Sequence, residues 1–220
     1  MPLLLVDLDN TLIDRAGAFS RWASAFVSER GGGPRDAAWL VEADRDGLEP
    51  RERLAGKISG RFGLDGRTEA RLAAELRGGL VRQIVPDDAV TGALRAARAA
   101  GWVPFVVTNG TVEQQERKLR HTGLDREVAG WVISEGAGLR KPDPEIFRLA
   151  AARAGQSLDG AWMIGDSAEA DIAGARGAGL AGVWLRRGRP WPLTEFQPAY
   201  AADSFPDAVR IVLTLSRGEP

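Results

Sequence analysis

The residues best suited to chemistry follow short apolar runs. The first such segment, LLLVDLDNTL at residues 3–12, carries four apolar residues and then Asp7 and Asp9. Other polar residues lie at the ends of later apolar runs or in the segments that follow them: Thr108, Asn109, Lys141, Asp166 and Asp171. If these runs are strands of one parallel sheet, their carboxyl ends meet at one edge, where ligands of such sheets bind.

Carboxylates brought together at such an edge repel one another, and a hard divalent cation relieves the repulsion. Magnesium takes oxygen ligands and typically uses one or two carboxylates together with substrate phosphate. Asp7 and Asp166 are the natural ligands in this set. Lys141 adds a positive charge, while Thr108 and the amide of Asn109 offer donors to phosphate oxygens. The combination suits phosphoryl transfer, in which catalysis is mostly positioning and charge stabilisation.

The elements that must position these residues are predicted from hydrophobic patterns and from glycine and proline. Strands are expected over residues 3–7, 102–108, 131–134, 161–165 and 180–185. Helices are expected between them, including one from 167 to 176, whereas residues 186–202 are expected to form a loop. Pro104 lacks a ladder donor, so we place it near the start of its strand. Alternating strands and helices predict an α/β fold with a doubly wound parallel sheet.

Residues 14–85 differ from the rest, because their pattern predicts only helices. Phe19, Trp22 and Phe26 recur at helical spacing, and a second helix is expected over residues 34–46. Later helices in this block are expected to end at Gly63 and at Gly78–Gly79, since glycine commonly terminates helices. We therefore expect two domains, an α/β core formed by residues 1–13 and 86–220 and an inserted all-helical domain formed by residues 14–85.

Composition excludes several classes of function. The net charge is −1, which gives no bulk electrostatic case for nucleic acid. The chain has no cysteine, so disulfides, thiol catalysis and cysteine-bound zinc are excluded. The longest apolar runs are too short to span a bilayer, and residues 3–6 are too short for a signal sequence. We expect a cytoplasmic protein that binds neither nucleic acid nor membrane.

Four motifs in order resemble those of the haloacid dehalogenase-like (HAD) superfamily: DLDNTL at 7–12, TNG at 108–110, KPDP at 141–144 and GDSAEAD at 165–171. The resemblance spans the whole chain and includes a helical insertion in the position of the family's type 1 cap. Each motif alone could be a turn or a helix cap, and for TNG alone the turn is the better interpretation. The four together favour the family, because all of them fall at expected strand ends.

The resemblance implies a role for each motif residue. Asp7 resembles the nucleophile that forms an aspartyl-phosphate. Asp9 resembles the general acid/base, which must hold a proton near neutral pH, and its backbone carbonyl would bind magnesium. Thr108 resembles the residue that holds the phosphoryl group. Lys141 resembles the lysine that neutralises nucleophile and phosphate.

The last motif supplies the remaining metal contacts by the same resemblance. Asp166 resembles the carboxylate ligand of Mg²⁺, and Asp171 resembles its supporting, often water-mediated, partner. The implied function is a magnesium-dependent phosphatase acting on a small phosphorylated metabolite, as a monomer or homodimer, with the helical domain closing over the substrate.

The same motifs are compatible with other functions. A phosphomutase of the same superfamily would share every core residue, and a non-catalytic HAD-like binding module would share the fold. Dehalogenation is disfavoured, because that branch lacks a carboxylate at the position of Asp9. Phosphonate hydrolysis is disfavoured on the same ground, and it would need a cap lysine, for which Lys57 is the only candidate.

Overall fold

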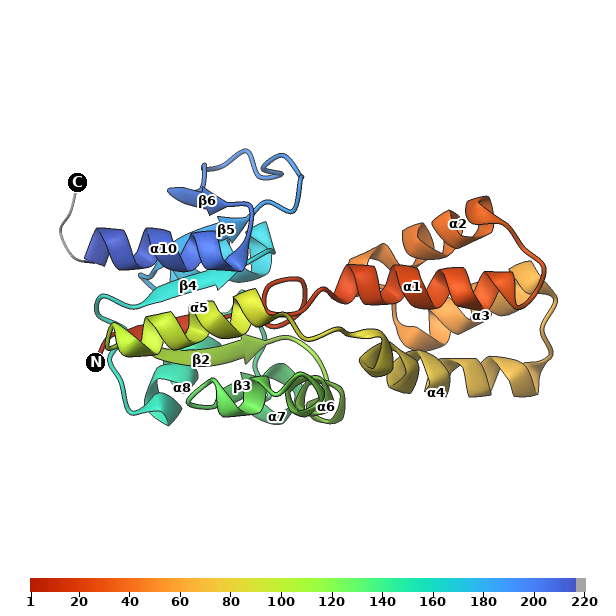
Figure 1. The fold of residues 1–220 in the computed structure, drawn as a ribbon, viewed down its shortest axis with the longest axis horizontal. Coiled ribbons are helices and arrows are strands. Elements are labelled where there is room, and N and C mark those ends of the chain that lie inside the picture. The colour runs from red at the N-terminus through yellow and green to blue at the C-terminus, as the bar shows by residue number, and fades with distance from the viewer. Residues whose placement is uncertain (217–220) are drawn as a thin grey trace. The chain divides into compact units, whose positions relative to one another are not determined.

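The chain divides into two compact units. The computed structural model describes residues 1–216 of the 220-residue chain. One unit comprises residues 1–13 together with 86–220, whose last four residues lie outside the described part, and the other comprises residues 14–85 (Figure 1). Among the described residues, no helix is both long enough and apolar enough to cross a membrane.

The first unit is built on a six-stranded sheet in the order β3-β2-β1-β4-β5-β6, and every neighbouring pair is parallel. Its strands are β1 (Leu3–Val6), β2 (Val103–Thr108), β3 (Trp131–Ile133), β4 (Trp162–Gly165), β5 (Ala181–Leu185) and β6 (Tyr200–Ala202). The predicted α/β fold class with a doubly wound parallel sheet is confirmed. The prediction of a loop over residues 186–202 is wrong at its end, because β6 is a three-residue edge strand, too short to give a periodic pattern.

Strand β1 lies inside the sheet, between β2 and β4, which explains its unbroken apolar run. All four of its residues are buried. Leu3 and Leu5 share a core cluster with Phe147 of α8 (Pro144–Ala154). Pro104 is the second residue of β2, near the strand's start as predicted, and its carbonyl accepts a hydrogen bond from Ala129 at 2.8 Å. The sheet therefore holds the end of β1 rigidly.

Helices cover both faces of the sheet (Figure 1). Besides α8, they are α5 (Asp88–Ala99), α6 (Val112–Thr122), α7 (Ser134–Ala137), α9 (Gly174–Gly177) and α10 (Phe205–Ser216), with short turns η2 (Leu124–Arg126) and η3 (Ala168–Ala173). Helices α5 and α10 pack against each other on one face, and α8 packs with α9 on the other.

Strand order reverses between β1 and β4. The chain runs from β1 outward through β2 to β3, returns to β4 beside β1, and then runs outward the other way through β5 to β6. Crevices at such reversal points, outside the carboxyl ends of the strands, are where open α/β sheets bind ligands. Asp7 follows β1 and Asp166 follows β4, so the topology brings the first and fourth motifs to this point.

The helix expected over residues 167–176 is wrong in type. The structure has a π-helix, η3, followed by the short helix α9. The amide of Ile172 donates to the carbonyl of Ser167 at 3.2 Å, the wider spacing of a π-turn. π-turns are rare and occur mostly at functional sites. No periodic pattern in the sequence distinguishes this turn from an α-helix.

The second unit contains only helices, as predicted: α1 (Arg15–Ser28), α2 (Pro34–Asp44), η1 (Arg45–Gly47), α3 (Arg51–Phe62) and α4 (Gly66–Gln83). Its core includes Phe19, Trp22 and Phe26, whose successive rings contact each other in tilted arrangements with centroids 5.3 and 5.1 Å apart. Phe62 meets Phe26 edge to face. The helical spacing of aromatic residues in α1 therefore marks a buried face.

Two helix ends in this unit differ from the prediction. Helix α2 ends at Asp44, because Arg45 and Asp46 adopt positive φ and the Asp44 carboxylate accepts from the amide of Gly47. Helix α4 continues through Gly78–Gly79 instead of ending there. Leu76 and Leu80, one turn apart, are both buried in α4, and their burial outweighs a propensity cost of about 1 kcal/mol per glycine.

Candidate active site

Three carboxylates of the first unit converge at the carboxyl edge of the sheet. Asp7 follows β1, Asp166 follows β4, and Asp171 lies in η3. One oxygen from each lies within 4.8 Å of the others, and all three side chains are buried. This is the convergence that the sequence predicted for Asp7, Asp166 and Asp171.

Lys141 lies among these carboxylates with only 2% of its surface exposed. Its Nζ donates to Asp7 Oδ1 at 2.7 Å, to Asp171 Oδ1 at 2.6 Å and to the carbonyl of Val107 at 2.7 Å. An ammonium has three protons, and each therefore has an acceptor. Lys141 is thus held rigidly between the two carboxylates by a saturated set of hydrogen bonds.

Burial and like charge dominate the electrostatics of the cluster. Burial raises the pKa of Asp7 to about 8; Lys141 opposes this rise, and the nearby Asp171 and Asp166 add to it. Burial and the charge of Asp171 also raise the pKa of Asp166. Burial lowers the pKa of Lys141, but the attraction of Asp171 and Asp7 outweighs it and leaves that pKa raised. The ammonium is therefore charged throughout the physiological range.

These shifts predict how stability depends on pH when divalent cations are removed with EDTA. Between the ordinary pKa of 3.8 and the folded value of about 8, folded Asp7 holds a proton that the unfolded chain has released. The free energy of unfolding should therefore fall as pH rises from about 5 to about 8. Asp166 shifts in the same direction. Carboxyls with a lowered pKa, such as Glu127, make the free energy of unfolding depend on pH only in more acidic solution, so they do not alter this decline.

Urea unfolding in EDTA at a series of pH values measures this slope. Asp7→Asn removes the titrating group and serves as the control, in which the decline should be reduced. A wild-type stability that increases over the same range would contradict the assignment.

Asp171 is positioned by its own turn. Its Oδ2 accepts from the backbone amide of Ser167 at 2.9 Å, so the carboxylate folds back over the start of η3. Gly165 makes this possible, because a Cβ at that position would lie 2.2 Å from Asp171 Oδ2. The glycine of the GDS segment is therefore required by the close approach of the Asp171 carboxylate.

Asp166 has cationic partners that the sequence analysis missed. Arg187 and Arg189 donate to Asp166 Oδ2 at 2.7 and 3.0 Å, and Trp184 donates to the Asp166 carbonyl at 2.9 Å. Arg187 adopts a φ of +51°, which is uncommon for a residue other than glycine. The segment was expected to be a loop, and nothing in its spacing pointed to Asp166; the run of arginines after β5 was the available signal.

The TNG segment supplies Thr108 and Asn109, but with different orientations. Thr108 is buried at the end of β2. The side-chain amide of Asn109 donates to the backbone carbonyl of Lys141 and accepts from the backbone N–H of Lys141, both at 3.0 Å. The Asn109 side chain therefore anchors the loop that carries Lys141. A direct contact of Asn109 with phosphate stays a prediction.

Asp9 lies outside the three-carboxylate group and contacts α6 instead. Lys118 Nζ lies 2.7 and 2.8 Å from its two oxygens, and Gln115 Nε2 lies 3.0 Å from Oδ2. Sequence reasoning missed both partners. Helix α6 has few apolar residues for its length, and this shortage was the only signal that polar side chains form part of its buried face.

The donor set fits a magnesium ion. Three buried carboxylates supply hard oxygen ligands, and the pairwise repulsion between them is what a divalent cation relieves. The set contains neither sulfur nor imidazole, which would favour zinc. Asp7 and Asp166 would be the carboxylate ligands, with Asp171 in support and the backbone carbonyl of Asp9 as a further candidate.

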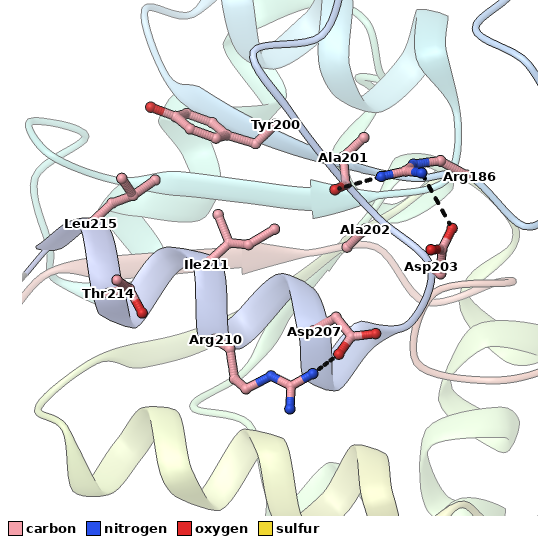
Figure 2. A pocket seen from close by; sticks show the side chains of 10 residues that line it. All are labelled: Arg186, Tyr200, Ala201, Ala202, Asp203, Asp207, Arg210, Ile211, Thr214 and Leu215. Carbon is pink, nitrogen blue, oxygen red and sulfur yellow. Dashed lines mark hydrogen bonds and ion pairs between the residues drawn. The ribbon is translucent and has the colours of Figure 1, made fainter. Parts of the chain in front are cut away.

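Away from these residues, a hollow of about 490 Å³ lies beside α10 and β6 (Figure 2). Its charged residues pair with one another: Arg186 lies 3.8 Å from Asp203, and Arg210 pairs with Asp207. The rest of its lining is largely apolar, including Ile211 and Leu215. None of the predicted site residues lines it, and we assign it no chemistry.

Comparisons with known proteins give matches to a family model and to individual relatives. A family model described as haloacid dehalogenase-like hydrolase matches residues 1–179. The chain is 29% identical over 230 residues to phosphoserine phosphatase of Thermus thermophilus, covering 86% of this chain and 90% of that protein. It is 38% identical over 104 residues to glyceraldehyde 3-phosphate phosphatase of Methanopyrus kandleri, covering 47% and 44%.

A solved structure extends the likeness in fold to nearly the full chain. The magnesium-bound HAD-hydrolase YfnB of Bacillus subtilis superposes with a TM-score of 0.70 at 24% identity, covering 96% of this chain and 98% of that one.

Proposed function

Because the chain belongs to the haloacid dehalogenase-like hydrolases, as its four motifs predicted, we propose that it is a magnesium-dependent phosphatase of a small phosphorylated metabolite. One observation carries the proposal: Asp7, Asp166 and Asp171 converge at the point where the sheet order reverses, and Lys141 pairs with Asp7 and Asp171. The phosphatases among the relatives support the choice of phosphate esters as substrates.

In this proposal Asp7 is the nucleophile. Its oxygen attacks phosphorus, the bond from phosphorus to the leaving oxygen breaks, and an aspartyl-phosphate forms. Lys141 holds one oxygen of Asp7 at 2.7 Å and so fixes the direction of attack. Lys141 also balances the negative charge of carboxylate and phosphoryl group in a site from which water is largely excluded.

Asp9 and Thr108 have different roles in the same reaction. Asp9 gives a proton to the leaving oxygen and then takes one from the water that attacks the aspartyl-phosphate. The Thr108 hydroxyl accepts from Gln115 Nε2 at 2.6 Å, so its own proton is available to a phosphoryl oxygen. When bound, magnesium would add positive charge at the phosphoryl oxygens. Asp7 and Asp166 would hold it, supported by Asp171.

The helical unit of residues 14–85 is the proposed cap. It is inserted directly after the Asp7–Ile13 segment, so the chain leaves the core at the edge that carries the candidate nucleophile. Closure of such a unit would exclude water and select the substrate. Phosphoserine and glyceraldehyde 3-phosphate, named for the two relatives, are the first substrates to try.

Hydrolysis of p-nitrophenyl phosphate with and without Mg²⁺ tests the proposal. We expect turnover that falls at least about 10²-fold in EDTA and returns when excess Mg²⁺ is added. A panel of phosphorylated metabolites, scored by phosphate release, then identifies the substrate. A sugar phosphate that is isomerised without phosphate release would indicate a phosphomutase instead. No turnover on any ester in Mg²⁺ would contradict the proposal and favour a binding module.

A further inference from the structure

The Asp9 carboxylate is held by two buried side chains of α6. Lys118 Nζ reaches both oxygens of Asp9, at 2.7 and 2.8 Å, and Gln115 Nε2 reaches Oδ2 at 3.0 Å. Lys118 is 7% exposed and Gln115 is 1% exposed, so both donors are themselves fixed by packing. A carboxylate that accepts hydrogen bonds on both oxygens from buried donors has little freedom to rotate.

Gln115 links Asp9 to Thr108. Its Oε1 accepts from Lys118 Nζ at 2.7 Å, which fixes the orientation of the amide, and its Nε2 donates to Thr108 Oγ1 at 2.6 Å. A Cβ at Gly110 would lie 3.0 Å from Cγ and Cδ of Gln115, so the glycine of TNG leaves room for this side chain. One amide thereby sets the separation between the acid/base candidate and the phosphate-binding candidate.

The residue type at position 118 also indicates that the contact with Asp9 is specific. The chain has 29 basic residues, but only three are lysines: Lys57, Lys118 and Lys141. Lys118 and Lys141 are the two that are buried, and each pairs with an aspartate of the DLDNTL segment. Burying an ammonium costs solvation free energy, and packing alone would be served better by an apolar side chain. A compact point charge suits a contact with both oxygens of one carboxylate.

We propose that Lys118 and Gln115 are positioning residues, which hold the Asp9 carboxyl in line with the leaving oxygen and at a fixed distance from Thr108. The inference rests on the proposed phosphatase function. As the bond from phosphorus to the leaving oxygen breaks and the bond from Asp7 forms, the Asp9 proton passes to that oxygen. In the second step Asp9 takes a proton from water, whose oxygen displaces Asp7 from phosphorus.

Neither Lys118 nor Gln115 exchanges a proton in this scheme. Lys118 can donate to both oxygens of the carboxylate and to the carbonyl oxygen of the protonated acid. The two side chains can therefore keep Asp9 oriented through both steps.

Substrates with leaving groups of different basicity distinguish a Lys118 that positions Asp9 from a Lys118 that only stabilises the fold. An alkyl phosphate needs a proton on its leaving oxygen, whereas 2,4-dinitrophenolate departs without one. In Lys118→Met we expect kcat/KM to fall about 10²-fold for an alkyl phosphate that the wild type hydrolyses, and by less than about 3-fold for 2,4-dinitrophenyl phosphate. The loss should lie in kcat with KM nearly unchanged, because Lys118 is not proposed to touch the substrate.

Matched variants on the same helix complete the test. Gln115→Leu should show the same selectivity for the alkyl ester to a smaller degree, and Lys118→Arg should restore part of the rate. Arg117→Met removes an exposed cation of α6 that pairs with Glu113, and it should leave both substrates unaffected. Thermal unfolding of each variant reports whether it is folded.

A second readout needs no turnover. In a double-mutant cycle, the losses in melting temperature caused by Asp9→Ala and by Lys118→Met should not add, because each removes the same contact. Additive losses would mean that the contact is not made. Equal losses of kcat/KM on both esters, or no loss on either, would overturn the positioning role even in a folded variant. A wild type that cleaves neither ester would instead end the proposed function, a result distinct from these.

Discussion

Asp7→Asn is expected to abolish phosphate release, lowering kcat by at least about 10⁴-fold while leaving the protein folded. An amide oxygen can still accept from Lys141, which also keeps Asp171 and the Val107 carbonyl as partners, so the local hydrogen bonds persist. An amide is a far poorer nucleophile than a carboxylate, so the covalent step is lost. Phosphate release in Mg²⁺ measures the rate, and circular dichroism checks the fold.

Asp159→Asn provides the matched control for this variant. It makes the same chemical change at an exposed aspartate of the same unit, and it should retain wild-type kcat. If Asp7→Asn kept more than about a tenth of wild-type activity, Asp7 would not be the nucleophile.

Lys141→Met should damage both stability and activity. The variant keeps the hydrocarbon stem but leaves two buried carboxylates, Asp7 and Asp171, without the ammonium that they share. Removing one partner of a buried ion pair typically costs about 3–5 kcal/mol. The loss should be smaller near pH 5, where Asp7 can take up a proton, than near pH 8, because the pKa of Asp7 is already raised to about 8 in the presence of Lys141.

Two measurements decide this second prediction. Urea unfolding in EDTA at the two pH values gives the free energy of unfolding, and kcat on p-nitrophenyl phosphate should fall about 10²–10³-fold in Mg²⁺. Lys57→Met, in the other unit, removes the partially exposed partner of Glu49 and should leave kcat unchanged. A Lys141→Met protein as stable as the wild type at both pH values would show that the carboxylates do not depend on this lysine.

The sheet and the position of its principal acidic residues could be predicted from the sequence. An unbroken apolar run such as Leu3–Val6 is typical of a strand buried on both faces, and Asp7 must then lie at its carboxyl end. Parallel strands share that edge, so Asp166 is brought to it by topology alone. Short motifs near strand ends are therefore sufficient to predict the convergence of Asp7, Lys141 and Asp166.

The partners of these residues could not be predicted, because they depend on tertiary packing. Gln115 and Lys118 are polar residues on the buried face of a helix, where periodicity predicts apolar ones. Arg187 lies in a segment after β5 that has no periodic pattern. The π-turn that directs Asp171 to Lys141 is a local change in hydrogen bonding that has no signature in composition.

Two helix ends in the helical unit could not be predicted from local sequence either. Gly78–Gly79 resembles a helix end in local propensity, but burial of Leu76 and Leu80 continues α4 through it. Asp44 ends α2 by a side-chain contact with the amide of Gly47, which acts over a few residues and leaves little trace in hydrophobic spacing.

Chemical trapping tests the central claim most directly. Borohydride added during turnover reduces an aspartyl-phosphate to homoserine, and peptide mass mapping then locates the modified residue. Homoserine is expected at position 7, dependent on both substrate and Mg²⁺, and absent from Asp7→Asn. Steady phosphate release with an unmodified Asp7, or with the modification at another carboxylate, would contradict it.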